Sequence, residues 1–302
     1  MKLSSLHLLL TYQCTFECDH CFVWGSPWQS GTMTLENIRH IVREAQDLGT
    51  ITSIYFEGGE PFLYYATLLA GVRLANAAGF ETGIVSNGYW ATSVDDALEW
   101  LRPFAGLIGD LSVSSDLYHY DEQLSRQAQH ACAAAERLGI PIGTISVASP
   151  EAADPMRVVG QLPENESGVM YRGRAAEKLS GQAPTQPWSQ FTTCPCEDLR
   201  EPGRIHVDPL GNLHICQGLV IGNLFQTPLK QICERYDPDR HPIIGPLLHG
   251  GPIELVKRYG LAQREAYADA CQLCYESRRL LRDRFPEALT PDQMYGVGLG
   301  IN

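Results

Sequence analysis

The 302-residue sequence lacks the features that mark several large classes of protein. No stretch approaches the roughly 18 uninterrupted apolar residues of a membrane-spanning helix, so we expect no contact with a membrane. No run of Lys and Arg exceeds a pair, and the formal net charge is −12, which argues against a nucleic-acid substrate. Ten cysteines in a chain of this length are too few for a disulfide scaffold. The first apolar run ends without a small-residue cleavage site, so the sequence predicts a cytoplasmic protein.

Three of the cysteines are clustered near the N-terminus, in residues 14–21 (CTFECDHC). They follow an apolar run at residues 6–10 that is typical of a buried strand. A loop that leaves a strand can fold three thiolates around one face of a [4Fe–4S] cluster, and three ligands leave one iron open for a non-protein ligand. A zinc knuckle or ordinary core cysteines are the alternatives. Zinc commonly takes four nitrogen or sulfur ligands, and no fourth cysteine is nearby.

Beyond this loop, strand and helix patterns alternate. Apolar runs predict strands at residues 51–56, 81–86, 111–114 and 141–147. Helical periodicity predicts helices at residues 35–48, 68–78, 94–101 and 121–138, with Thr34 and Ser93 as N-caps of the first and third. Regular alternation of this kind builds a parallel sheet through right-handed crossovers. Residues 169–171 are candidates for a sixth strand, preceded by a brief helix within residues 150–167.

The second predicted strand ends in the segment EGGEP, residues 57–61. Adjacent glycines at the carboxyl end of a strand allow backbone atoms to approach a ligand closely. One helix and one strand separate this segment from the cysteine loop. The cysteine spacing and the GGEP segment together resemble the signature of the radical S-adenosylmethionine (radical SAM) enzymes.

This resemblance implies a partial (β/α)6 barrel, a [4Fe–4S] cluster and bound S-adenosylmethionine (SAM). Cys14, Cys18 and Cys21 would ligate the cluster, and the amino and carboxylate groups of SAM would fill the open iron. The residues that would shape the SAM pocket are Glu57, Gly58, Gly59, Glu60, Pro61, Ser86, Asn87, Ser114 and Asp116. His20 would lie next to the adenine, and Arg174 would pair with the SAM carboxylate.

The C-terminal third holds a second group of cysteines. Residues 204–208 and 213–216 flank a Gly-Asn turn and predict a β-hairpin. The arrangement resembles the auxiliary-cluster domains called SPASM and twitch, which implies a second [4Fe–4S] cluster. Its four ligands would be Cys196, Cys216, Cys271 and Cys274. Cys194 is an alternative to Cys196, and a structural zinc ion is an alternative to the cluster.

The fold class we expect is α/β, in four segments. A radical SAM partial barrel occupies residues 1–180, and a linker occupies residues 181–193. A small auxiliary domain, a β-hairpin plus helix, occupies residues 194–285. The tail, residues 286–302, either folds over the barrel mouth or frays.

The resemblance also implies a reaction. A reductant such as flavodoxin or ferredoxin reduces the first cluster, SAM is cleaved to a 5′-deoxyadenosyl radical, and that radical abstracts a hydrogen atom from the substrate. An auxiliary cluster implies that the substrate radical is then oxidised, as in a radical SAM oxidoreductase or maturase. Modification of a ribosomal peptide or protein, by dehydrogenation or cross-linking, is the leading hypothesis. The chain begins at its first strand without a leader-binding domain, so we expect direct recognition or a separate recognition protein.

Two other functions stay open at this point. One is oxidation of a small metabolite, such as an aminosugar or an amino-acid derivative. The other is a non-catalytic iron–sulfur or zinc scaffold, which would not bind SAM. The sequence identifies no catalytic acid or base.

Overall fold

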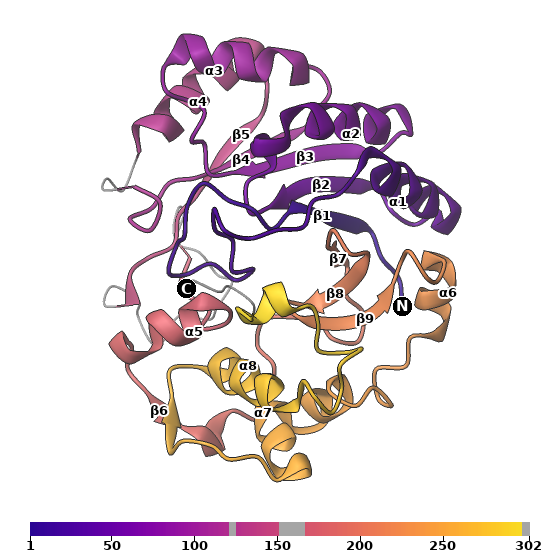
Figure 1. Cartoon of the computed structure of the whole chain (residues 1–302), viewed down its shortest axis with the longest axis vertical. Coiled ribbons are helices and arrows are strands. Elements are labelled where there is room, and N and C mark those ends of the chain that lie inside the picture. Colours follow the sequence, from indigo (N-terminus) through magenta and orange to yellow (C-terminus); the bar gives the residue numbers. More distant parts are fainter. Residues whose placement is uncertain (121–124, 151–166, 298–302) are drawn as a thin grey trace.

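The protein is described by a computed structural model, which covers residues 1–120, 125–150 and 167–297. Its centre is an eight-stranded sheet in the order β5-β4-β3-β2-β1-β7-β8-β9 (Figure 1). The strands are β1 (Ser5–Thr11), β2 (Ser53–Gly58), β3 (Glu81–Ser86), β4 (Asp110–Ser114), β5 (Ile142–Ile145), β7 (Arg204–Val207), β8 (Asn212–Cys216) and β9 (Leu219–Asn223). Neighbouring strands from β5 to β7 are parallel, whereas β7, β8 and β9 are antiparallel.

Four helices cover one face of the parallel strands (Figure 1). They are α1 (Leu35–Leu48), α2 (Tyr65–Ala77), α3 (Val94–Leu101) and α4 (Arg126–Leu138). Thr34 and Ser93 cap α1 and α3, as predicted, because each side chain accepts a backbone N–H of the first turn. Leu6, Leu8 and Leu10 of β1 are buried in the core under these helices. Side chains alternate along a strand, so the odd-numbered residues of β1 point to the opposite face.

The predicted sixth strand is wrong. Residues 169–171 form no strand, and the pairing recorded nearby is a single bridge between Val147 and Ser167. Val169 and Tyr171 instead bury their side chains against α5 (Arg174–Lys178), which explains the apolar pattern. The brief helix expected before them falls mostly in residues 151–166, outside the described part of the chain. The predicted hairpin does form, as β7 and β8, but it joins the main sheet because β7 pairs with β1.

The remaining C-terminal elements lie on the other side of the sheet, except α6, which packs against α1. They are β6 (Gln186–Pro187), α6 (Leu229–Arg235), α7 (Ile244–Tyr259), β10 (Ala266–Tyr267) and α8 (Ala270–Leu281). Short 3-10 turns occupy Pro61–Tyr64, Arg102–Phe104, Ser180–Gln182, Trp188–Gln190 and Asp292–Tyr295. Leu9 and Tyr12 are buried with side chains of α7 and α8 in a second core. Among the described residues, no helix has the length and apolar character needed to cross a bilayer.

The described part of the tail, up to Val297, is packed. Met294 and Tyr295 are almost completely buried in the second core. The Tyr295 hydroxyl donates to the Gly218 carbonyl oxygen at 2.7 Å, and its ring stacks on that of Tyr275 in α8. The segment therefore extends the C-terminal core.

Candidate active site

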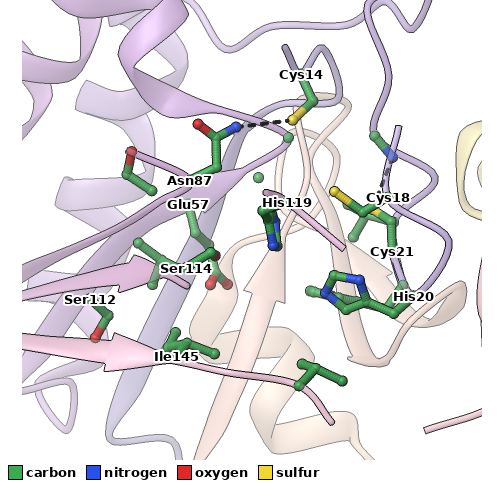
Figure 2. A pocket seen from close by; sticks show the side chains of 18 of the residues that line it. Cys14, Cys18, His20, Cys21, Glu57, Asn87, Ser112, Ser114, His119 and Ile145 are labelled. Carbon is green, nitrogen blue, oxygen red and sulfur yellow. Dashed lines mark hydrogen bonds between the residues drawn. The ribbon is translucent and has the colours of Figure 1, made fainter. Parts of the chain in front are cut away.

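A cavity of about 620 Å³ lies at the carboxyl ends of the parallel strands, facing the cysteine loop (Figure 2). This volume is typical of a small-molecule site. Ten of the residues predicted for the site line it: Cys14, Cys18, His20, Cys21, Glu57, Gly58, Gly59, Ser86, Asn87 and Ser114. Four others, Glu60, Pro61, Asp116 and Arg174, are not among its lining residues.

The three N-terminal thiols share one end of the cavity. Backbone N–H groups donate to two of them, from Phe16 to Cys14 Sγ at 3.4 Å and from Gly25 to Cys21 Sγ at 3.2 Å. The amide of Asn87, at the end of β3, also reaches Cys14 Sγ, at 3.5 Å (Figure 2). Burial, the largest cause, raises the pKa of Cys14 to about 12. A cation bound at Cys14 would stabilise its thiolate form.

The spacing of these thiols bears on which metal group they fit. Two sulfurs on one tetrahedral zinc ion lie about 3.8 Å apart, from a Zn–S length of about 2.3 Å. Among the described residues, the sets of three metal-ligating atoms that lie within 4.8 Å of one another contain no cysteine. At least one pair of the N-terminal sulfurs is therefore wider apart than a single zinc ion requires. This spacing does not favour a single zinc ion held by all three thiols.

Gly58 and Gly59 pack against the chain that leads into the cysteine loop. A side chain at Gly59 would lie 2.1 Å from the Gln13 carbonyl oxygen, and one at Gly58 would lie 2.4 Å from that of Thr11. The Gly59 N–H donates to the Thr11 carbonyl oxygen at 2.7 Å. Close approach is thus required, as the sequence indicated, but the partner in this structure is the protein's own backbone.

Glu60 joins the end of β2 to the end of β3. Its carboxylate is completely buried and accepts hydrogen bonds from the backbone N–H groups of Phe62 and Asn87 and from the hydroxyl of Ser86. Burial, the largest cause, outweighs these donors and raises the pKa of Glu60 to about 7. Its partners are therefore protein groups that set the position of Asn87 beside Cys14.

Asp116, after β4, orients histidines of the cavity wall. Its carboxylate accepts from Nδ1 of His119 at 2.8 Å and from the Val147 N–H at 3.2 Å. Burial alone would raise its pKa, but the hydrogen bond and charge of His119 outweigh burial and lower it. His20 lies beside this pair, with its ring 5.2 Å from that of His119, and burial lowers the pKa of His20 to about 4. His20 is therefore neutral at physiological pH.

Arg174, at the start of α5, holds the cysteine loop. Its guanidinium is buried and donates to the carbonyl oxygens of Cys18 at 2.7 Å and Gly25 at 2.9 Å. The indole of Trp24 covers the guanidinium at 5.3 Å. In this structure the predicted SAM-carboxylate partner acts on the loop backbone.

The sequence model of the Radical SAM superfamily matches residues 8–147. The chain contains a radical SAM domain. This domain class has the SAM-binding and iron–sulfur chemistry that the motifs implied.

Individual proteins resemble parts of the chain. The chain is 33% identical over 111 residues to the "Putative peptide biosynthesis protein YydG" of Bacillus subtilis, across 36% of this chain and 35% of that protein. It is 29% identical over 119 residues to an S-adenosylmethionine-dependent nucleotide dehydratase of Fibrobacter sp., across 37% and 33%. The chain thus aligns with about a third of the length of each of these curated relatives.

Two solved structures share the fold over a longer span. One is SuiB of Streptococcus suis bound to S-adenosylmethionine, with a TM-score of 0.51 at 13% identity, covering 81% of this chain and 67% of that one. The other is native anSMEcpe with bound AdoMet, with a TM-score of 0.50 at 14% identity, covering 95% and 98%. At these identities the likeness extends to the fold alone.

The sheet side of the cavity carries residues that the sequence analysis did not select. His7 of β1 and His206 of β7 lie at paired positions and flank the Glu57 carboxylate. Burial alone would raise the pKa of Glu57, but His206 and His7 together lower it well below its usual range. Burial lowers the pKa of His206. The odd-numbered positions of β1, which include His7, were the one feature of the sequence that pointed to this face of the sheet. His206 lies on a strand nearly 200 residues further along the chain, so no local pattern pairs the two histidines.

A second thiol group lies outside residues 8–147. It contains the four predicted ligands and Cys194, and all five thiols are partly buried. Cys196 Sγ and Cys271 Sγ are 3.4 Å apart. Burial, the largest cause, raises the pKa of Cys194 and of Cys274, and the neighbouring Cys216 raises both further. Two buried arginines face the group. Arg172 donates to Cys216 Sγ at 3.4 Å. The charge of Arg278 lowers the pKa of Cys274 against the larger effect of burial.

Proposed function

We propose that this protein is a radical SAM enzyme that removes a hydrogen atom from a peptide or protein substrate and oxidises the substrate by two electrons. The observation that carries the proposal is the position of Arg172. It lines the cavity, and its guanidinium also contacts Cys216 of the second thiol group. The cavity thus has one thiol group at its loop end and another behind its wall. A substrate in the cavity would lose a hydrogen atom on the side of the first group and then pass an electron to the second group.

Cys14, Cys18 and Cys21 would hold the first [4Fe–4S] cluster, and Cys196, Cys216, Cys271 and Cys274 a second one. When bound, the first supplies the electron that cleaves SAM to a 5′-deoxyadenosyl radical, and the second accepts the electron left on the substrate. The protein's own part is placement. Asn87 fixes the Cys14 side chain, and Arg174 fixes the loop backbone.

Electrostatics support an anionic group at the second thiols. The side-chain Nε atoms of Arg172 and Arg278 are buried and lack a hydrogen-bond partner among the described residues. Buried guanidinium groups require nearby negative charge, and Glu197, at 2.9 Å from Arg172, supplies one carboxylate. Thiolates carrying an iron–sulfur cluster would supply the rest. A neutral set of thiols would leave these charges poorly compensated.

The substrate class rests on the comparisons. The printed name of YydG refers to peptide biosynthesis, which supports a peptide substrate. The nucleotide dehydratase supports the second candidate, a small metabolite, as does a cavity of small-molecule size. A candidate peptide and a candidate nucleotide, each incubated anaerobically with SAM and a reductant such as reduced flavodoxin, separate the two. The substrate is the one whose mass falls by two hydrogens.

Iron counting tests the chemistry itself. We expect about eight irons per chain after anaerobic reconstitution, and about four when Cys14, Cys18 and Cys21 are all changed to Ala. That variant should form no 5′-deoxyadenosine from SAM. About four irons falling to none would contradict the second cluster. Two clusters without SAM cleavage would leave the non-catalytic scaffold as the better description.

A further inference from the structure

Three metal-ligating side chains meet on the sheet side of the cavity. One ligand atom each of His7, His206 and Glu57 lies within 4.8 Å of the other two. Glu57 Oε1 is 3.0 Å from the His206 nitrogen and 3.3 Å from the His7 nitrogen. The three residues come from three adjacent strands, β2, β1 and β7.

These short approaches are not aligned as hydrogen bonds. Glu57 Oε1 is buried and has no hydrogen-bond partner among the described residues, although two imidazole nitrogens lie close to it. A buried carboxylate oxygen without a partner is costly, so native structures rarely leave one. Ligand atoms that lie close together without hydrogen-bonding to one another have the arrangement that ligands adopt around a shared cation.

The distances fit a first-row metal ion. Adjacent ligands at about 2.1 Å from an octahedral ion are about 3.0 Å apart, and those on a tetrahedral zinc ion are about 3.4 Å apart. The observed distances of 3.0 and 3.3 Å from Glu57 Oε1 to the two imidazole nitrogens fall within this range. The Tyr55 ring stacks on His7 at 4.8 Å with 7° between the planes, which restricts rotation of the His7 imidazole. Such fixed orientation of a ligating imidazole is a usual property of metal sites.

We propose that His7, Glu57 and His206 bind one divalent first-row metal ion, such as Fe²⁺ or Zn²⁺, separate from any iron–sulfur cluster. Two histidines and one carboxylate leave coordination positions open. All three residues line the cavity, so those positions face a molecule bound there. The ion would hold an oxygen of that molecule, a carboxylate, phosphate or amide carbonyl, and so fix its orientation. This goes beyond the proposed radical chemistry and does not depend on it.

Manganese is the suitable probe, because Mn²⁺ prefers nitrogen and oxygen ligands to thiolates and has an EPR signal. The cluster-reconstituted protein is titrated with Mn²⁺ without SAM, and the free-ion signal is followed. We expect one bound Mn²⁺ per chain that Zn²⁺ displaces, with nitrogen couplings from two imidazoles in pulsed EPR. Glu57→Gln and His206→Ala should each weaken binding at least tenfold. Iron content per chain reports whether each variant is folded.

Two control variants locate the site. His249→Ala removes an exposed histidine of α7, and His119→Ala removes a member of the other three-residue set, His20, Asp116 and His119. Both should bind Mn²⁺ as the unchanged protein does. No retained Mn²⁺ or Zn²⁺ would overturn the proposal, as would unchanged affinity in Glu57→Gln and His206→Ala. Loss of binding in His119→Ala alone would also overturn the proposal. A bound Mn²⁺ without imidazole coupling would overturn it as well, and this measurement on the unchanged protein does not require the variants to fold.

Discussion

The two thiol groups of this protein are built in opposite ways. The N-terminal group comes from one loop of eight residues, has backbone and amide donors on its sulfurs, and lines the cavity. The C-terminal group spans residues 194–274, and its thiols are not among the cavity's lining residues. Two buried arginines face it.

This difference indicates two uses of sulfur. Three thiols at a cavity leave a metal position accessible to a small molecule, whereas a larger set behind the wall can satisfy every metal position. The first group needs precise placement, which backbone contacts provide. The second needs charge compensation, which the arginines provide. Four comparisons between variants test this contrast.

The largest effect should come from choosing between Cys194 and Cys196. A thiolate is the form that binds iron. Cys196 Sγ lies 3.4 Å from the Sγ of Cys271, another predicted ligand, which places Cys196 beside that ligand set. We therefore expect Cys196→Ala to lose about half of the iron, and Cys194→Ala to retain nearly all of it. Iron analysis and EPR of both variants provide the measurement, and the reverse result would assign Cys194 as the ligand.

Gly59→Ala tests the placement of the first group. The added methyl would lie 2.1 Å from the Gln13 carbonyl oxygen, so the chain before Cys14 must move. We expect destabilisation above about 3 kcal/mol and loss of the first cluster, with the second retained. Gly143→Ala in β5 is the matched control, because no atom lies within 4 Å of its added methyl. Equal iron content and stability in both variants would show that the glycine contact does not position the loop.

The sequence predicted local structure well because its signals are local. Strand β3 and helices α1 and α3 have the predicted bounds, and the caps Thr34 and Ser93 are confirmed. A capping side chain acts within one helical turn, so its pattern survives in any fold. The apolar residues near Val169 wrongly predicted a sixth strand, because burial against a helix and burial in a sheet require the same residue types.

The candidate site was harder to predict in detail. The cysteine spacing located the loop, but no local pattern shows that Arg174 binds its carbonyl oxygens. His7 and His206 become neighbours only because β7 pairs with β1, a contact between distant parts of the sequence. Such parallel pairing depends on the whole chain and leaves no short-range signal.

Arg172→Met tests charge compensation in the second group. Removal of the guanidinium leaves Glu197 and the neighbouring thiolates without their cation. Breaking a buried pair in this way costs about 3–5 kcal/mol, so we expect a lower melting temperature and reduced occupancy of the second cluster. Arg240→Met removes an exposed pair with Asp237 and should change stability by less than about 1 kcal/mol. Similar behaviour of the two variants would contradict a special role for Arg172.

The smallest effect we expect is a pH dependence confined to the first group. Glu60 has a folded pKa of about 7, above its usual 4.5, because burial favours the protonated carboxyl. Between these values the folded state retains a proton that the unfolded state releases, so the free energy of unfolding falls as pH rises from about 4.5 to about 7, by up to about 3 kcal/mol. Glu60→Gln cannot titrate and should lose this slope, whereas Glu99→Gln, at an exposed position, should keep it. Urea unfolding of the anaerobic apoprotein from pH 4.5 to 8 measures the slope. An unchanged slope in Glu60→Gln would show that Glu60 does not titrate in this pH range, because the donors from Ser86 and Asn87 hold its carboxylate ionised. Charged side chains would then position both thiol groups.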